Sequence, residues 1–160
     1  MNYDLTTDIL QSADDFYEAY KRCREVTNER HQGSKTINIP AIVNGAFACE
    51  LYTKYLANSK LTGHNLKILF AELDEKYQKE ILDESTSNKL QQIAVRYGYD
   101  SFDTSFEEMG SIFTEWRYIF EKDCPEGFYG NRMNMYLETL EILLMRLSAV
   151  SHNKEMSILN

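Results

Sequence analysis

Arg146 and His152 are the residues whose types and spacing best fit a chemical role. They lie at the two ends of the stretch RLSAVSH, with five residues between them. A guanidinium group binds a phosphate through two parallel hydrogen bonds. An imidazole titrates near neutral pH, so it can donate or accept a proton. Together the two side chains could hold a phosphate and move a proton, as RNA cleavage without a metal ion requires.

Helix geometry sets a condition on this pair. At roughly 100° and about 1.5 Å per residue, Arg146 and His152 lie about 120° apart around a straight helix and about 9 Å apart along it. They converge on one phosphate only if the helix ends between them or if a second subunit completes the site. Leu147 occupies an expected core position, and His152 lies in a polar tail that we expect to fray. The alternative interpretation is that RLSAVSH is the polar end of a structural helix.

Further candidate residues lie on two other expected helices. Glu50 and Lys54 are four residues apart, so they share a helix face and can form an ordinary ion pair. Arg117 follows Trp116 in FTEWRYIFE and has Glu121 four residues later, as at the edge of a helix. None of the three histidines has metal-ligand spacing, and there is neither a glycine-rich phosphate loop nor a nucleophile elbow. The sequence therefore predicts neither a metal site nor a cofactor.

Composition limits the expected partners and setting. A net charge of -8 repels nucleic acids at long range, so RNA binding needs a local basic patch, and no DNA binding is expected. The three cysteines are scattered and form no disulfide framework, which favours a reducing, cytoplasmic setting. No stretch has the pattern of a signal peptide or of a membrane span, so no membrane association is expected.

The elements that must position these residues are helices. Apolar residues recur three and four apart, and only two prolines and seven glycines interrupt them. We expect an all-α, up-and-down bundle of about five helices, forming a single domain over residues 1–160 with its core at about 12–152. The expected helices run from a cap at Ser12 to about 31, from Pro40 to 58, from a cap at Thr62 to about 82, from 106 to about 120, and from 133 to about 152, with a short turn capped by Ser87 and a loop over 97–105.

The segment AFACELYTKYLANSKLTGHNLKILFAEL resembles the second and third helices of HEPN domains. These are helical-bundle domains of prokaryotic toxin–antitoxin and phage-defence systems, and of nucleotidyltransferase partners. The resemblance lies in small residues around Glu50 and Lys54, then a short linker and a Gly-His-x-Leu helix start that contains His64. WRYIFE resembles the Arg-Tyr element of such domains, carried here by Arg117 and Tyr118.

The resemblance covers roughly residues 38–145. It implies an up-down helical bundle that often forms a homodimer. In active members it also implies RNA cleavage without a metal ion, in which an arginine holds the phosphate, a histidine acts as general acid or base, and the RNA 2′-hydroxyl attacks. Arg146 and His152 would be the catalytic pair here. The other family-motif or RNA-phosphate positions would be Glu50, Lys54, His64, Arg117 and Tyr118.

Three functions remain open from the sequence, and whether the chain is an enzyme is open with them. The first is a HEPN-like protein of a prokaryotic conflict or defence system that binds RNA and could cleave it without metal. The second is a non-catalytic module for protein interaction or dimerisation. The acidic charge favours it, and so does the imperfect match of RLSAVSH to the arginine–histidine motif of active HEPN domains. The contact surfaces of such a module would be the aromatic-rich stretches GYDSFDTSF and CPEGFYGN. The third is a partner that presents substrate to a separate nucleotidyltransferase.

Overall fold

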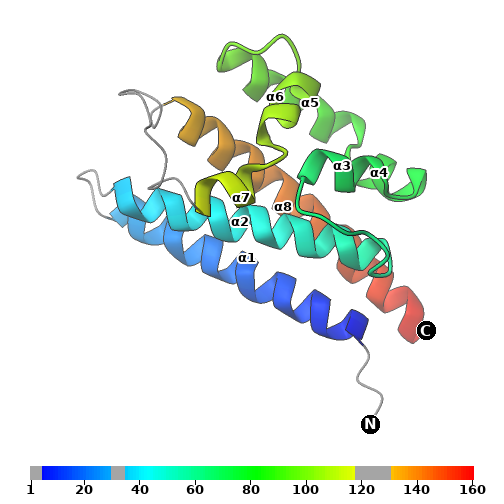
Figure 1. Cartoon of the computed structure of the whole chain (residues 1–160). Coiled ribbons are helices and arrows are strands. Elements are labelled where there is room, and N and C mark those ends of the chain that lie inside the picture. The colour runs from blue at the N-terminus through cyan, green and yellow to red at the C-terminus, as the bar shows by residue number, and fades with distance from the viewer. Residues whose placement is uncertain (1–4, 30–34, 118–130) are drawn as a thin grey trace.

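The computed structural model describes residues 5–29, 35–117 and 131–160. Within these ranges the chain forms helices and no strand, which confirms the predicted all-α class (Figure 1). The described residues form eight helices rather than about five, because three of the expected stretches extend or divide. The helices are α1 (Leu5–Glu29), α2 (Lys35–Leu56), α3 (Leu66–Ala71), α4 (Glu75–Ile81), α5 (Glu84–Arg96), α6 (Phe102–Met109), α7 (Ile112–Arg117) and α8 (Asn131–Leu159).

Three long helices form the main layer of the bundle. α2 packs along α1 on one side and against α8 on another, whereas α1 and α8 touch each other only slightly. α2 runs antiparallel to α1, and α8 runs in the same direction as α2 (Figure 1). Because α3 and α7 also pack on α2, this helix has apolar residues all round rather than on one stripe. Its buried apolar residues are Ile39, Ala41, Ile42, Ala46, Ala48, Cys49, Tyr52, Tyr55 and Leu56.

A close approach at Gly45 connects α1 to α8 across α2. A Cβ atom at Gly45 would lie 2.8 Å from Tyr20 Cδ2 and 3.3 Å from Leu140 Cδ1. The hydroxyl of Tyr20 donates a hydrogen bond to the backbone carbonyl of Leu137 at 3.1 Å. The missing side chain of Gly45 therefore gives the Tyr20 ring room to pass over α2 and reach α8.

The first two helices begin earlier than predicted. α1 begins at Leu5 rather than after a cap at Ser12. α2 begins at Lys35, so Pro40 lies inside the helix and not in its first turn. Proline lacks the N–H that would bond the carbonyl four residues back. The helix continues through Pro40 because the residues that follow, Ala41 and Ile42, are completely buried.

Two shorter helices are capped by other residues than those predicted. Asn65 caps α3, with its side-chain oxygen accepting the N–H of Ile68 at 3.1 Å, so the predicted cap Thr62 is wrong. Asp83 caps α5, with its carboxylate accepting the N–H of Thr86 at 2.8 Å. The predicted cap Ser87 is therefore wrong, because Ser87 lies inside α5, which begins at Glu84.

The stretch from 106 to 120, predicted as one helix, divides after Met109. A Cβ atom at Gly110 would lie 2.5 Å from the side-chain oxygen of Asn65, so no side chain fits there. The carbonyl of Gly110 accepts the N–H of Leu66 at 2.7 Å. The start of α3 thus packs onto the turn between α6 and α7. The loop predicted over 97–105 is also shorter, because Ser101 caps α6.

The last helix is longer than predicted. α8 is continuous from Asn131 to Leu159, so the prediction that the tail around His152 frays is wrong. Its apolar stripe is buried, as the spacing predicted. The stripe consists of Met133, Leu137, Leu140, Leu144 and Leu147.

No helix within the described ranges is long and apolar enough to cross a membrane.

Substitution of Gly45 tests the close approach of α1 and α2. We expect Gly45→Ala to lower the free energy of unfolding by about 1–3 kcal/mol through overpacking, although alanine is the better helix former. The cost should be smaller in a Tyr20→Leu background, because the ring that meets the new Cβ is gone. Denaturant unfolding of the wild type, the two single variants and the double variant measures both effects. A Gly45→Ala variant that is more stable than the wild type would contradict the close approach.

Candidate functional site

Arg146 is turned toward the short helices. Its guanidinium group lies 2.8 Å from the carboxylate of Asp83 and donates to the backbone carbonyls of Glu80 and Ile81. Hydrogen bonds from Thr86, the largest cause, and the charge of Arg146 lower the pKa of Asp83. Because Ile81 ends α4 and Asp83 caps α5, Arg146 fastens the turn between these two helices to α8.

His152 is turned toward α1 and forms an ion pair there. Its Nε2 lies 3.1 Å from Asp14 Oδ2, and its Nδ1 lies 2.8 Å from the backbone carbonyl oxygen of Ser148. Both partners are acceptors, so both ring nitrogens donate when the imidazole is protonated. Burial lowers the pKa of His152, but the Ser148 carbonyl and the Asp14 carboxylate outweigh burial and raise it above its usual value. The other oxygen of Asp14 accepts the hydroxyl of Tyr52 at 2.6 Å, so this cluster joins α1, α2 and α8.

The structure does not bring Arg146 and His152 together within one chain. α8 is unbroken between them, so the first condition for their convergence, a helix end, is not met. One side chain contacts the α4–α5 turn, and the other contacts α1. The second condition, completion by another subunit, stays a prediction.

The family-motif positions Glu50, Lys54 and His64 do lie together. Glu50 is 1% exposed, with Lys54 Nζ at 2.7 Å from its carboxylate and His64 Nδ1 at 3.0 Å. An unpaired carboxylate at such a position would be costly, so the two partners stabilise Glu50 and fix the linker after α2 onto that helix. The carboxylate also orients the imidazole of His64, whose side chain is 55% exposed. The spacing predicted the ion pair, but it did not predict that Glu50 is buried.

The remaining predicted positions are described only in part. Arg117 is the last residue of α7, which packs on α2. Tyr118 and all of the stretch CPEGFYGN except its last residue, Asn131, lie outside the described residues. The stretch GYDSFDTSF crosses from a turn into α6, where Phe106 is buried in the core and not on a contact surface.

Lys154 stabilises the fold, and the sequence did not predict this role. Its Nζ donates to the carbonyls of Tyr55 and Leu56 at 2.9 and 3.1 Å, and to the side chain of Asn58 at 2.7 Å. The Nζ also lies over the ring of Tyr77, 5.7 Å from its centroid. Burial lowers the pKa of Lys154. Lys154 therefore caps the carboxyl end of α2, where the helix dipole favours a cation. Its place in a polar tail gave no sequence signal.

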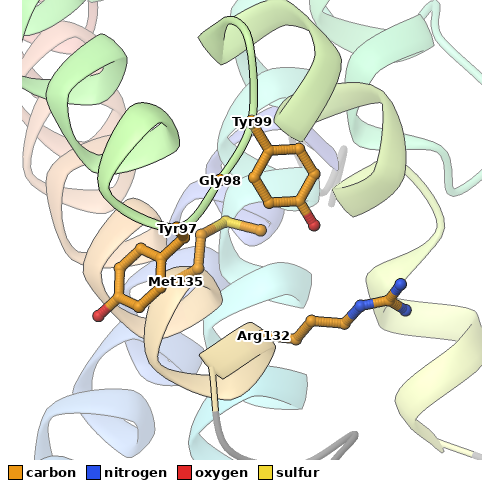
Figure 2. A pocket seen from close by; sticks show the side chains of 5 residues that line it. All are labelled: Tyr97, Gly98, Tyr99, Arg132 and Met135. Atoms are coloured by element: carbon orange, nitrogen blue, oxygen red, sulfur yellow. The ribbon is translucent and has the colours of Figure 1, made fainter.

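A small pocket of about 140 Å³ lies near the start of α8. Two of its polar side chains meet at Glu108, which accepts the hydroxyl of Tyr99 at 2.7 Å and whose other oxygen lies 3.0 Å from Arg132 Nε. The hydroxyl of Tyr97 donates to Glu138 instead. Tyr136 donates to Glu108 at 3.3 Å. The contacts of Glu108 join α6 to α8, so we interpret them as structural. The pocket is lined by Tyr97, Gly98, Tyr99, Arg132 and Met135 (Figure 2).

In the second half of α8, three cationic side chains contact partners in their own chain, while several apolar side chains outside the buried stripe are exposed. Arg146, His152 and Lys154 each contact partners in their own chain, as described above. One line along this helix contains residues 145, 149, 152, 156 and 159, which are alternately four and three apart. His152 is its middle member, and the other four residues are uncharged and exposed. The α8 row is defined as the four apolar members of this line, Met145, Ala149, Met156 and Leu159. Met145 and Met156 are each 59% exposed, and Leu159 is 75% exposed.

Comparisons with family models, with curated proteins and with solved structures gave no match to this chain. Among the described residues, no group of three or more His, Cys, Asp or Glu side chains is placed to hold a metal ion. The resemblance to HEPN domains therefore stays a prediction.

The ion pair of His152 makes the stability depend on pH. Because the pKa of His152 is raised in the folded chain, the pair stabilises fully below the unfolded value near 6.5 and is lost as pH rises through the folded value. We expect His152→Gln to cost up to about 1 kcal/mol near pH 6, and clearly less near pH 9. Urea unfolding at both values measures the difference. The same cost at both pH values would contradict the ion pair between His152 and Asp14. Glu155 is the other charged group near His152.

The buried carboxylate of Glu50 makes its ion pair with Lys54 unequal to an exposed pair of the same spacing. We expect Lys54→Met to lower the free energy of unfolding by roughly 1–3 kcal/mol, because it removes one partner of a buried carboxylate. The matched control is Lys79→Met, since Lys79 lies 2.6 Å from Glu75 with both side chains more than 70% exposed. That control should cost at most about 0.5 kcal/mol. Equal costs would show that burial of Glu50 does not matter.

Proposed function

We propose that this protein is a non-catalytic protein-interaction module that self-associates through α8. Two copies meet along the α8 row. The observation that carries the proposal is the exposed α8 row, beside which Arg146, His152 and Lys154 contact partners in their own chain.

The comparison with α2 explains why such a face needs a partner. Both helices carry apolar residues on more than one side. α2 is covered by four neighbouring helices, whereas the α8 row of the described chain remains exposed. A contiguous exposed apolar surface commonly marks a site of protein interaction. Covering one exposed methionine or leucine is worth about 1.5–3 kcal/mol at most, so the three such residues of the row, counted in both copies, can support association.

Charge and spacing favour a second copy as the occupant. With a net charge of -8, two chains repel each other at most surfaces, and they can approach along a strip whose one charged member, His152, is paired with Asp14. A basic partner would instead call for carboxylates on the contact face, and the row has none. The alternation of four and three residues is the spacing of a seam between two packed helices. The same strip on both copies gives a closed two-fold contact.

This proposal differs from RNA cleavage in what it requires of Arg146 and His152. Here both side chains stabilise the bundle, and neither needs to meet a phosphate. The two functions can be tested on one preparation by incubating purified protein with RNA. Our proposal expects intact RNA. RNA fragments that appear with the wild type and disappear with His152→Ala would overturn the non-catalytic function.

The test of self-association is the mass in solution. We expect light scattering to give twice the chain mass of 18.7 kDa for the wild type, and the single-chain mass for Met156→Glu. The glutamate places two like charges in the contact of acidic copies. The matched control is Val95→Glu on α5, where the valine is 57% exposed but lies on another helix, and it should remain dimeric. A monomeric wild type, or a dimer that tolerates Met156→Glu, would contradict the proposal.

A further inference from the structure

A second pocket, of about 230 Å³, lies between α1 and α8 beside the α8 row. It forms where these two helices flank α2 but scarcely touch each other. Met145 belongs both to its wall and to the row. The pocket is lined by Tyr17, Tyr20, Lys21, Arg24, Glu25, Glu141 and Met145.

The lining combines apolar surface with charges that cancel, so it suits an uncharged side chain. Tyr17, Tyr20 and Met145 provide two rings and a thioether, and burial raises the pKa of Tyr17, so the phenol stays neutral. The four charged residues of the lining are two cations and two carboxylates, so the pocket carries no net charge. Lys21 is paired with Glu18 at 2.7 Å and lies over the ring of Tyr17. A charged ligand would therefore find no excess of opposite charge.

The row itself indicates which segment reaches this pocket. The α8 row runs from residue 145 to residue 159, so its midpoint is residue 152. In an antiparallel two-fold contact, residues equally distant from the midpoint on the two copies lie opposite each other. Met145 then faces Leu159 of the partner subunit. Ile158 and Leu159 are the most exposed large apolar side chains of the described residues, at 69% and 75%.

We infer that the α1–α8 pocket of one copy receives Leu159, with Ile158 beside it, from the partner subunit. This inference rests on the proposed self-association and specifies its orientation and register. It makes α1 part of the contact, through Tyr17, and gives a partner to the last turn of α8. His152 lies at the midpoint, where Asp14, Ser148 and the neighbouring Glu155 of its own chain already face it. The centre of the contact therefore has its polar groups satisfied.

Cysteine cross-linking between copies tests the register. Met145→Cys and Leu159→Cys are made as separate chains in a background of Cys23→Ser, Cys49→Ala and Cys124→Ser, whose folding and dimeric mass are first checked. The two chains are mixed, allowed to exchange and oxidised. We expect a disulfide-linked dimer from the mixture and little from either chain alone, because a disulfide needs Cα atoms about 4.4–6.8 Å apart. Efficient self-linking of Met145→Cys would indicate a parallel contact and overturn the inference.

Coupling between the pocket and its occupant gives a second readout. We expect Leu159→Ser and Tyr17→Ser each to raise the Kd of dimerisation by roughly tenfold. The double variant should be much weaker in effect than the product of the two, because both remove the same contact. Additive effects would place the two residues in separate contacts. A wild type that is monomeric by light scattering would defeat the proposed function itself, whereas a dimer with the wrong cross-links or additive effects would defeat only the register.

Discussion

The burial of α2 is the constraint on which the other polar contacts depend. A helix covered on several sides leaves little water for its polar groups, so most of them need a partner in the protein. Glu50 finds Lys54 and His64, and Tyr52 finds Asp14. The last carbonyls of α2 find Lys154. Polar residues of α1, of α8 and of the linker after α2 thus provide partners for the polar groups of α2.

The same constraint accounts for the contacts of three cationic side chains in the second half of α8. Their acceptors lie at helix ends and in the α1 contact: Arg146 at the α4–α5 turn, His152 at Asp14, and Lys154 at the end of α2. Arg146 and His152 resemble a catalytic pair by spacing, but packing contacts within the chain explain both side chains. Those contacts do not explain the α8 row beside them.

Sequence periodicity predicted the helical class, the buried stripe of α8 and the Glu50–Lys54 pair, because each depends on residues within one helix. It did not predict features that depend on contacts between helices. Residue 110 is a glycine because Asn65, from a distant segment, occupies the space that a Cβ atom would need. Lys154 has no local pattern, since its acceptors lie almost a hundred residues earlier in the chain. The directions of Arg146 and His152 needed the knowledge that α8 is unbroken, which a polar tail does not reveal.

The passage of Tyr20 over Gly45 has a consequence for the order of events during synthesis. α1 and α2 can pair as soon as they leave the ribosome, because they are adjacent in sequence. The carbonyl of Leu137 that accepts the Tyr20 hydroxyl belongs to the last helix, as do His152, which pairs with Asp14, and Lys154, which caps the end of α2. Until α8 emerges, one apolar flank of α2 stays open to water and to other chains. The nascent hairpin is therefore the stage at which this chain is most exposed to misassembly.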